Sequence, residues 1–255
     1  MNEIDRISQK YNNIFQLLLE YEELLRKNCN NVSYSKEFVE YSEVYNYLKT
    51  KALRTFLSIR MLLELCRIED TFALLRVLLE NICNLVFLIE NPEKVNSYKT
   101  SEMKVYNTVV QTISKQTKFM KDVSPIFVLV DSSIKTNFKE VAQISKKIRK
   151  KREKDQWSTL TFEQKITDIG LPKLYIQYLI SSGYIHSNWF EKNALKSLDE
   201  SIETVTGSVV ELYGILIRTL NKAVTDDLDP VIDETLKYQL SIERELKEIS
   251  FKKHT

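Results

Sequence analysis

The sequence predicts an all-α fold, a multi-helix bundle around a buried central helix, and three observations support this. The chain has only 4 Gly and 4 Pro in 255 residues, which leaves little material for tight turns. Apolar residues recur at alternating steps of three and four over long stretches, as on one face of a helix. Residues 71–89 are apolar on nearly all sides, as expected for a helix surrounded by other helices.

The N-terminal part predicts two amphipathic helices. The apolar stripe of the first consists of Ile4, Ile7, Tyr11, Ile14, Leu18, Tyr21 and Leu25. A polar break follows at Asn28, Asn30 and Asn31, and a second helical region extends over about 35–65. Its apolar face carries Tyr41, Tyr45, Leu48, Ala52, Phe56 and Ile59.

The central helix over 71–89 stops at Asn91-Pro92, where Asn91 can cap the next helix and Pro92 takes its first position. That next helix, over about 92–121, has a weaker and more polar pattern. Ser124-Pro125 repeats the start signal, so we expect 126–130 to be helical, with a short strand as the alternative.

The C-terminal half contains further helix signals. Thr161 and Gln164 fit a capping box, and Gly170 with Pro172 marks a stop and a restart. A second long stripe then carries Leu195, Leu198, Ile202, Val205, Val209, Leu212 and Leu216, and we expect Gly207 and Gly214 on that helix to admit a close neighbour. Asp229-Pro230 begins the last helix. We expect one domain over 1–255, with a mobile basic excursion at 145–157.

Composition and charge narrow the class of protein. A net charge of +2 gives no global field toward nucleic acid or a membrane. The three cysteines, Cys29, Cys66 and Cys83, form no C-x-x-C pair, and we interpret them as reduced thiols. The first ten residues lack the apolar region of a signal peptide, so we expect a cytoplasmic protein. Polar residues interrupt 71–89, which favours a core helix over a membrane span.

Common catalytic and binding motifs are absent. There is no G-x-G-x-x-G, P-loop, H-E-x-x-H or E-x-x-H, and the chain has only two histidines, His186 and His254. We therefore expect neither a cofactor nor a metal ion.

Two constellations could carry chemistry. Arg76 and Glu80 are four residues apart and share a helix face. On an apolar helix the pair is either a core ion pair that fixes helix register or part of a functional pocket. Ser182 and His186 are also four apart, but no oxyanion loop or nucleophile elbow accompanies them. His186 is either a structural residue or a pocket residue near Glu80.

These residues lie in two longer patterns. The segment over 74–93 reads L-L-R-x-L-L-E-x-x-x-N-x-x-F-L-x-x-N-P-E, and that over 175–188 reads Y-x-x-Y-x-x-x-S-x-x-x-H-x-N. Together they resemble an uncharacterised family of prokaryotic helical proteins that is loosely similar to HEPN-type domains. The resemblance implies that Arg76, Glu80, Ser182 and His186 form one candidate catalytic cluster. HEPN ribonucleases carry an Arg five residues before a His, and that motif is absent here.

A basic run over 146–154 contains seven Lys or Arg residues in nine. Either it is a solvated helix or loop, or it contacts the phosphates of a nucleic acid. The residues that would make these contacts are Lys146, Lys147, Arg149, Lys150, Lys151 and Arg152, with Trp157 for base stacking.

The sequence leaves two functional hypotheses. The first is a non-catalytic interaction or regulatory module, a homodimer through one of the long apolar stripes. The second is a nucleic-acid-directed enzyme or toxin of a prokaryotic defence system, with Glu80 and His186 as acid and base. If the polar cluster is only structural and buried, loss of Glu80 should cost roughly 3 to 5 kcal/mol.

Overall fold

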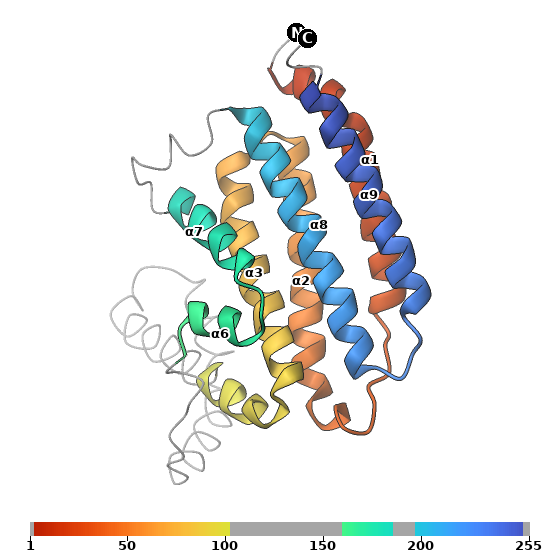
Figure 1. Cartoon of the computed structure of the whole chain (residues 1–255), viewed down its shortest axis with the longest axis vertical. Coiled ribbons are helices and arrows are strands. Elements are labelled where there is room, and N and C mark those ends of the chain that lie inside the picture. The colour runs from red at the N-terminus through yellow and green to blue at the C-terminus, as the bar shows by residue number, and fades with distance from the viewer. Residues whose placement is uncertain (1–2, 103–159, 186–196, 252–255) are drawn as a thin grey trace, which may run out of the picture. The chain divides into compact units, whose positions relative to one another are not determined.

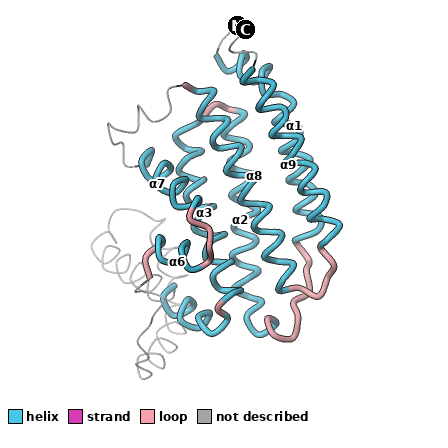
Figure 2. Tube along the Cα trace, viewed as in Figure 1, coloured by secondary structure: helices cyan, strands magenta, loops and turns pink. Residues whose placement is uncertain are grey.

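The structure is a computed structural model that describes residues 3–102, 160–185 and 197–251, and these residues are mostly helical (Figure 1). The elements are α1 (Glu3–Cys29), η1 (Val39–Tyr41), α2 (Ser42–Glu64), α3 (Ile68–Glu90), η2 (Pro92–Lys94), α6 (Phe162–Asp168), α7 (Lys173–Ile185), α8 (Leu198–Ala223) and α9 (Asp229–Phe251). Figure 2 shows no strand among the described residues, where β-pairing is limited to an isolated antiparallel bridge between Tyr34 and Val224. The predicted all-α fold is confirmed.

The chain divides into two compact units. One comprises Met1–Pro92 and Phe162–Thr255, and the other comprises Glu93–Thr161. Of the second unit, the description covers the end of η2, a helical stretch over 95–102 and residues 160–161. The elements predicted between 103 and 159, including the basic excursion at 145–157, lie outside the described residues. That 1–255 form a single domain stays a prediction.

Helix α3 is the centre of the first unit. It packs against α2 and α8 on one side and against α6 and α7 on the other (Figure 1). Its buried residues point in most directions around the helix axis: Thr71, Phe72, Leu75, Leu78, Leu79, Asn81, Ile82, Cys83, Leu85, Val86, Phe87, Leu88 and Ile89. The predicted buried central helix is therefore confirmed.

The same helix is, by length and composition alone, the one described helix that could cross a membrane. Two-thirds of its most apolar window (67%) is nevertheless buried against the rest of the chain. A core helix passes the same test of length and hydropathy, and the packing of α2, α7 and α8 around α3 supports that interpretation.

The long apolar stripes of α1 and α8 are buried against other helices of the same chain. Helix α1 packs against α2 and α9, and α8 packs against α3 and α9. The stripe residues Ile7, Tyr11, Ile14, Leu18, Tyr21 and Leu25, and Ile202, Val205, Val209, Leu212 and Leu216, are at most 1% exposed. The surface from which a homodimer is predicted is thus covered within one copy. The dimer itself stays a prediction.

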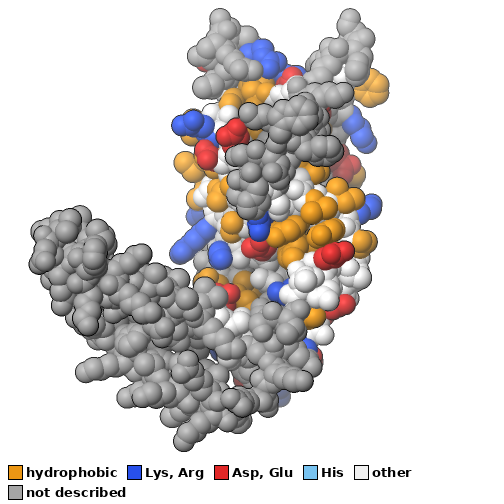
Figure 3. Space-filling model, turned by 90° about the vertical axis from the view of Figure 1, so that its left-hand side faces the viewer, with side chains coloured by type: hydrophobic (Ala, Val, Ile, Leu, Met, Phe, Trp, Pro, Cys, Tyr) orange, Lys and Arg blue, Asp and Glu red, His pale blue; other side chains and the backbone are white. Residues whose placement is uncertain are grey.

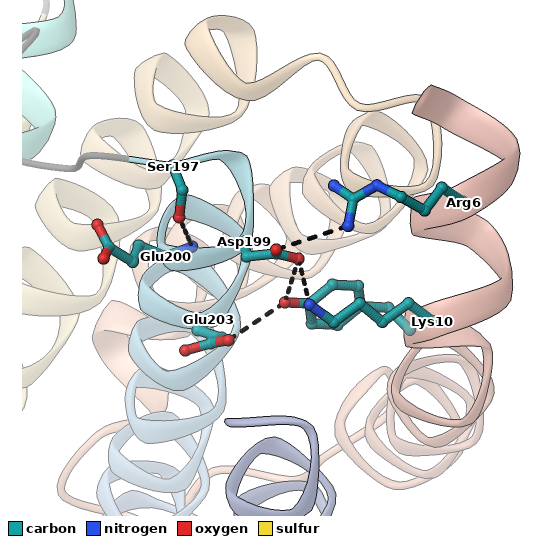
Figure 4. A network of polar contacts seen from close by, with 7 residues as sticks. Arg6, Lys10, Ser197, Asp199, Glu200 and Glu203 are labelled. Carbon is teal, nitrogen blue, oxygen red and sulfur yellow. Dashed lines mark hydrogen bonds and ion pairs between the residues drawn. The ribbon is translucent and has the colours of Figure 1, made fainter. Parts of the chain in front are cut away.

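A polar network joins the start of α1 to the start of α8 (Figure 4). Lys10 Nζ donates to Asp199 Oδ1 at 2.8 Å, and the hydroxyl of the buried Tyr11 donates to the same oxygen at 2.9 Å. Burial and the carboxylate of Asp199 raise the pKa of Tyr11. Ser197 caps α8, because its Oγ accepts from the amide of Glu200 at 3.1 Å. The network fixes the register between these two helices.

Several helix ends match their predicted signals, and two differ. Gly170 has a φ of +70° and ends α6, and α9 begins at Asp229, as predicted. By contrast, Asn91 Nδ2 donates to the carbonyl of Phe87 at 2.9 Å, so its side chain caps the end of α3 rather than the next helix. Helix α2 begins at Ser42 rather than near 35, and the chain before it instead pairs with the end of α8, where the amide of Ser35 donates to the carbonyl of Ala223.

The two glycines of α8 have different surroundings. A Cβ on Gly214 would collide with Gln239 Nε2 of α9, which donates to the carbonyl of Val210 at 2.9 Å. No atom lies within 4 Å of the corresponding position on Gly207. The predicted close approach of a neighbour is therefore confirmed at Gly214 and wrong at Gly207.

Lys49 of α2 is a buried lysine at the C-terminal end of α1. Its Nζ donates to the carbonyl of Asn30 at 3.1 Å, where the partial negative charge of the helix end favours a cation. Burial lowers the pKa of Lys49 from its ordinary value of 10.5. Between this lowered pKa and 10.5, the unfolded chain binds more protons than the folded chain, so stability from Lys49 rises with pH.

We expect Lys49→Met to be neutral or stabilising near pH 7, since a residue of similar volume removes the desolvation of the charge. The difference in free energy of unfolding, wild type minus variant, should increase as pH rises toward 10.5. Urea denaturation of both proteins across this range measures it. Burial raises the pKa of Cys29 to about 11 and the charge of Lys49 lowers it, so the comparison is also made with Cys29 replaced by Ala in both proteins. A difference that falls with pH would contradict the expectation.

Candidate functional site

The site predicted from the sequence is centred on Arg76 of α3. Its Nε donates to Glu80 Oε1 at 3.2 Å, one helical turn along, as the spacing predicts. Its other contact comes from far along the chain, because NH2 donates to the hydroxyl of Tyr178 at 3.0 Å. The guanidinium carbon lies 4.9 Å from the centre of the same ring, which is a cation–π distance. We call Arg76, Glu80 and Tyr178 the Arg76 cluster.

Side chains of α6 and α7 extend the cluster. The ring of Phe162 packs on Tyr178 with centroids 4.1 Å apart, and the ring of Tyr175 lies 6.3 Å away. One turn beyond Glu80, Asn84 Oδ1 accepts from Lys165 Nζ at 3.3 Å. Polar residues at 76, 80 and 84 therefore form a seam along α3 at the edge where α6 and α7 cover it.

The cluster is less buried than the sequence predicts. The side chain of Glu80 is 43% exposed, and that of Arg76 is partly exposed. An ion pair with this much solvent contact contributes on the order of 1 kcal/mol or less, not the roughly 3 to 5 kcal/mol of a buried charge. The prediction of a buried Arg–Glu pair is thus wrong for Glu80, and its carboxylate is open to a ligand.

The second predicted constellation is described only in part. Ser182 lies on α7, one turn after Tyr178, and its Oγ is buried with no hydrogen-bond partner among the described residues. The neighbouring Ser181 instead donates to the carbonyl of Gln177 at 2.8 Å. Helix α7 is described to Ile185, and His186 lies outside the described residues. The approach of His186 to Glu80 therefore stays a prediction.

Other reactive groups near the cluster are unsuited to chemistry. Cys83 faces the same region, but burial raises the pKa of its thiol to about 12, so it is protonated at neutral pH. All three cysteines are free, which fits the predicted reduced thiols. Within the ranges that the structure describes, no group of three His, Cys, Asp or Glu side chains could hold a metal ion.

The predicted nucleic-acid-binding residues Lys146, Lys147, Arg149, Lys150, Lys151, Arg152 and Trp157 lie outside the described residues. Conversely, the sequence assigns no role to Tyr178 or Lys165. Tyr178 is separated from Arg76 by 102 positions, and local periodicity contains no information on such a pairing. The repeated Tyr at 175 and 178 was the available signal.

The chain was compared with models of protein families. A family of unknown function, DUF5677, matches residues 42–202. This is more than half of the chain. The chain belongs to this family. The match extends from α2 to the start of α8 and includes every residue of the Arg76 cluster. It supports the resemblance to an uncharacterised family. Searches of curated proteins and of solved structures found no match.

Proposed function

We propose that the chain is a non-catalytic helical interaction or regulatory module, and that its partner is a second copy of itself bound to the outer face of α7. The main support for this proposal is that α7 has apolar side chains on both its inner and its outer side. Its inner side packs on α3, with Leu174 buried, while Ile176 and Leu179 on the outer side are 61% and 51% exposed.

The surroundings of this face support a symmetric contact. Figure 3 shows hydrophobic side chains gathered on the side of the molecule that carries α6 and α7. Grouped apolar side chains on a surface are typical of interaction sites. In a two-fold symmetric interface, if residue i of one copy contacts residue j of the other, then j also contacts i. The partly exposed Arg76 of one copy can therefore face Glu80 of the other, and the reverse.

Light scattering at micromolar concentration tests the proposal. We expect a dimer for the wild type and a monomer for Leu179→Lys. Leu240→Lys is the control, because Leu240 is also exposed, to 66% against 51% for Leu179, but lies on α9. A monomeric wild type, or equal masses for both variants, would overturn the proposed dimer face.

A nucleic-acid-directed enzyme of a prokaryotic defence system, distantly related to HEPN domains, is the second candidate. It is favoured by the exposed carboxylate of Glu80 and by its contact, through Arg76, with the helix that precedes His186. Purified protein would then cleave RNA or DNA, and both His186→Ala and Glu80→Gln would abolish cleavage without loss of fold. Absence of cleavage across a broad substrate panel would exclude this candidate.

A further inference from the structure

A groove on the outer side of α2 is separate from the Arg76 cluster. It has a volume of about 590 Å³ and follows α2 over about four turns, with Leu74 of α3 as part of its wall. Its lining residues are Glu43, Asn46, Tyr47, Thr50, Lys51, Arg54, Thr55, Ser58 and Leu74. We propose that this groove binds single-stranded nucleic acid. This proposal does not depend on the proposed dimer face on α7.

The groove presents two cations to solvent. Lys51 and Arg54 are exposed and lie three residues apart, on the same side of α2. Neither side chain contacts a carboxylate within the described ranges. Glu43 is the acidic residue of the lining, at one end, so the groove keeps a net positive charge. Phosphate groups are the natural counterions for such a pair of cations.

The groove also presents an aromatic ring. The side chain of Tyr47 is 51% exposed, and Lys51 Nζ lies 5.8 Å from the centre of its ring. An exposed tyrosine ring next to a cation gives a base a surface for stacking and its phosphate a charge partner. A simple anion would use the cations but not the ring.

Neutral polar groups complete the surface. Asn46 lines the groove, and because its Oδ1 accepts from the hydroxyl of Tyr34 at 3.2 Å, its amide NH₂ is the group that can donate to a ligand. Thr50 adds a hydroxyl one turn along from Asn46. These groups suit the edges of bases and the sugars. The combination of stacking ring, paired cations and neutral donors is typical of single-strand binding without strong sequence preference.

Fluorescence anisotropy with a short labelled single-stranded oligonucleotide tests this on the full chain at low salt. We expect binding that weakens as salt rises, and a log–log salt slope that becomes shallower by about 1.4 in Lys51→Gln/Arg54→Gln, at about 0.7 per phosphate contact. Tyr47→Ala should weaken binding by at least about fivefold, whereas Tyr47→Phe should retain it.

The charge-matched control is Lys237→Gln/Arg244→Gln, which removes two exposed cations from α9 and should leave binding unchanged. No detectable binding by the wild type would overturn the proposal. Equal affinity of the Lys51→Gln/Arg54→Gln variant and the wild type would also overturn it, and would direct attention to the basic run over 146–154. Binding of inorganic phosphate alone, with no effect of Tyr47→Ala, would show an anion site rather than a nucleic-acid site.

Discussion

Replacement of Arg60 by Met is expected to lower the free energy of unfolding by about 3 to 5 kcal/mol. Arg60 Nε of α2 donates to Glu22 Oε2 of α1 at 3.0 Å, and NH1 donates to Glu64 at 2.6 Å. The side chain of Glu22 is only 3% exposed. Loss of Arg60 therefore leaves a buried carboxylate without its main cation, which is among the most destabilising single changes. Urea denaturation measures the loss.

Arg26 provides the matched control on the same carboxylate. Its NH1 lies 3.8 Å from Glu22 Oε1, but its side chain is 60% exposed. We expect Arg26→Met to cost about 1 kcal/mol or less. The double variant Glu22→Gln/Arg60→Met should recover part of the stability lost in Arg60→Met, because no buried charge remains. An Arg60→Met loss no larger than that of Arg26→Met would contradict the expected role of this pair.

Tyr178→Ala is expected to lower the free energy of unfolding by about 2 to 4 kcal/mol and to loosen α6 and α7 selectively. The change removes the hydrogen bond to Arg76, the cation–π contact and the ring contact with Phe162. Amide hydrogen exchange should accelerate in α6 and α7 while α1, α8 and α9 keep their protection, since local opening requires only local contacts to break.

Tyr178→Phe separates the two kinds of contact. It keeps the ring over Arg76 and against Phe162 and removes only the hydroxyl, so we expect a loss of about 1 kcal/mol. If exchange in α6 and α7 is the same in Tyr178→Ala as in the wild type, the Arg76 cluster does not hold these helices on α3.

The fold was predictable where apolar residues recur at helical spacing along a segment. The stripes of α1 and α8 and the all-round apolar character of α3 follow from periodicity alone, because burial selects residues at helical spacing. The start of α2 was not predictable in this way. The segment before α2 pairs with the end of α8, through a backbone bond from Ser35 to Ala223, and these residues are far apart in sequence.

The polar contacts were predictable only at short range. The bond between Arg76 and Glu80 follows from a spacing of four, but the bond from Arg76 to Tyr178 depends on how α7 packs on α3. The burial of Glu22 was also not predictable from local sequence. It lies in a charged stretch that is typical of solvent-exposed helix, and only the packing of α1 on α2 shows that it is buried.

The contacts of α1 with α8 and α9 also bear on how the chain is made. Lys10 bonds a residue 189 positions later, and Asn13 bonds one 232 positions later. At about 5 to 20 residues per second, a ribosome needs roughly 10 to 50 s to supply the last of these partners. Until α8 and α9 have been synthesised, α2 is the one of these three helices that can cover the tyrosines and leucines of α1. A newly synthesised chain therefore exposes apolar surface of the kind that general chaperones shield until α8 and α9 have been made.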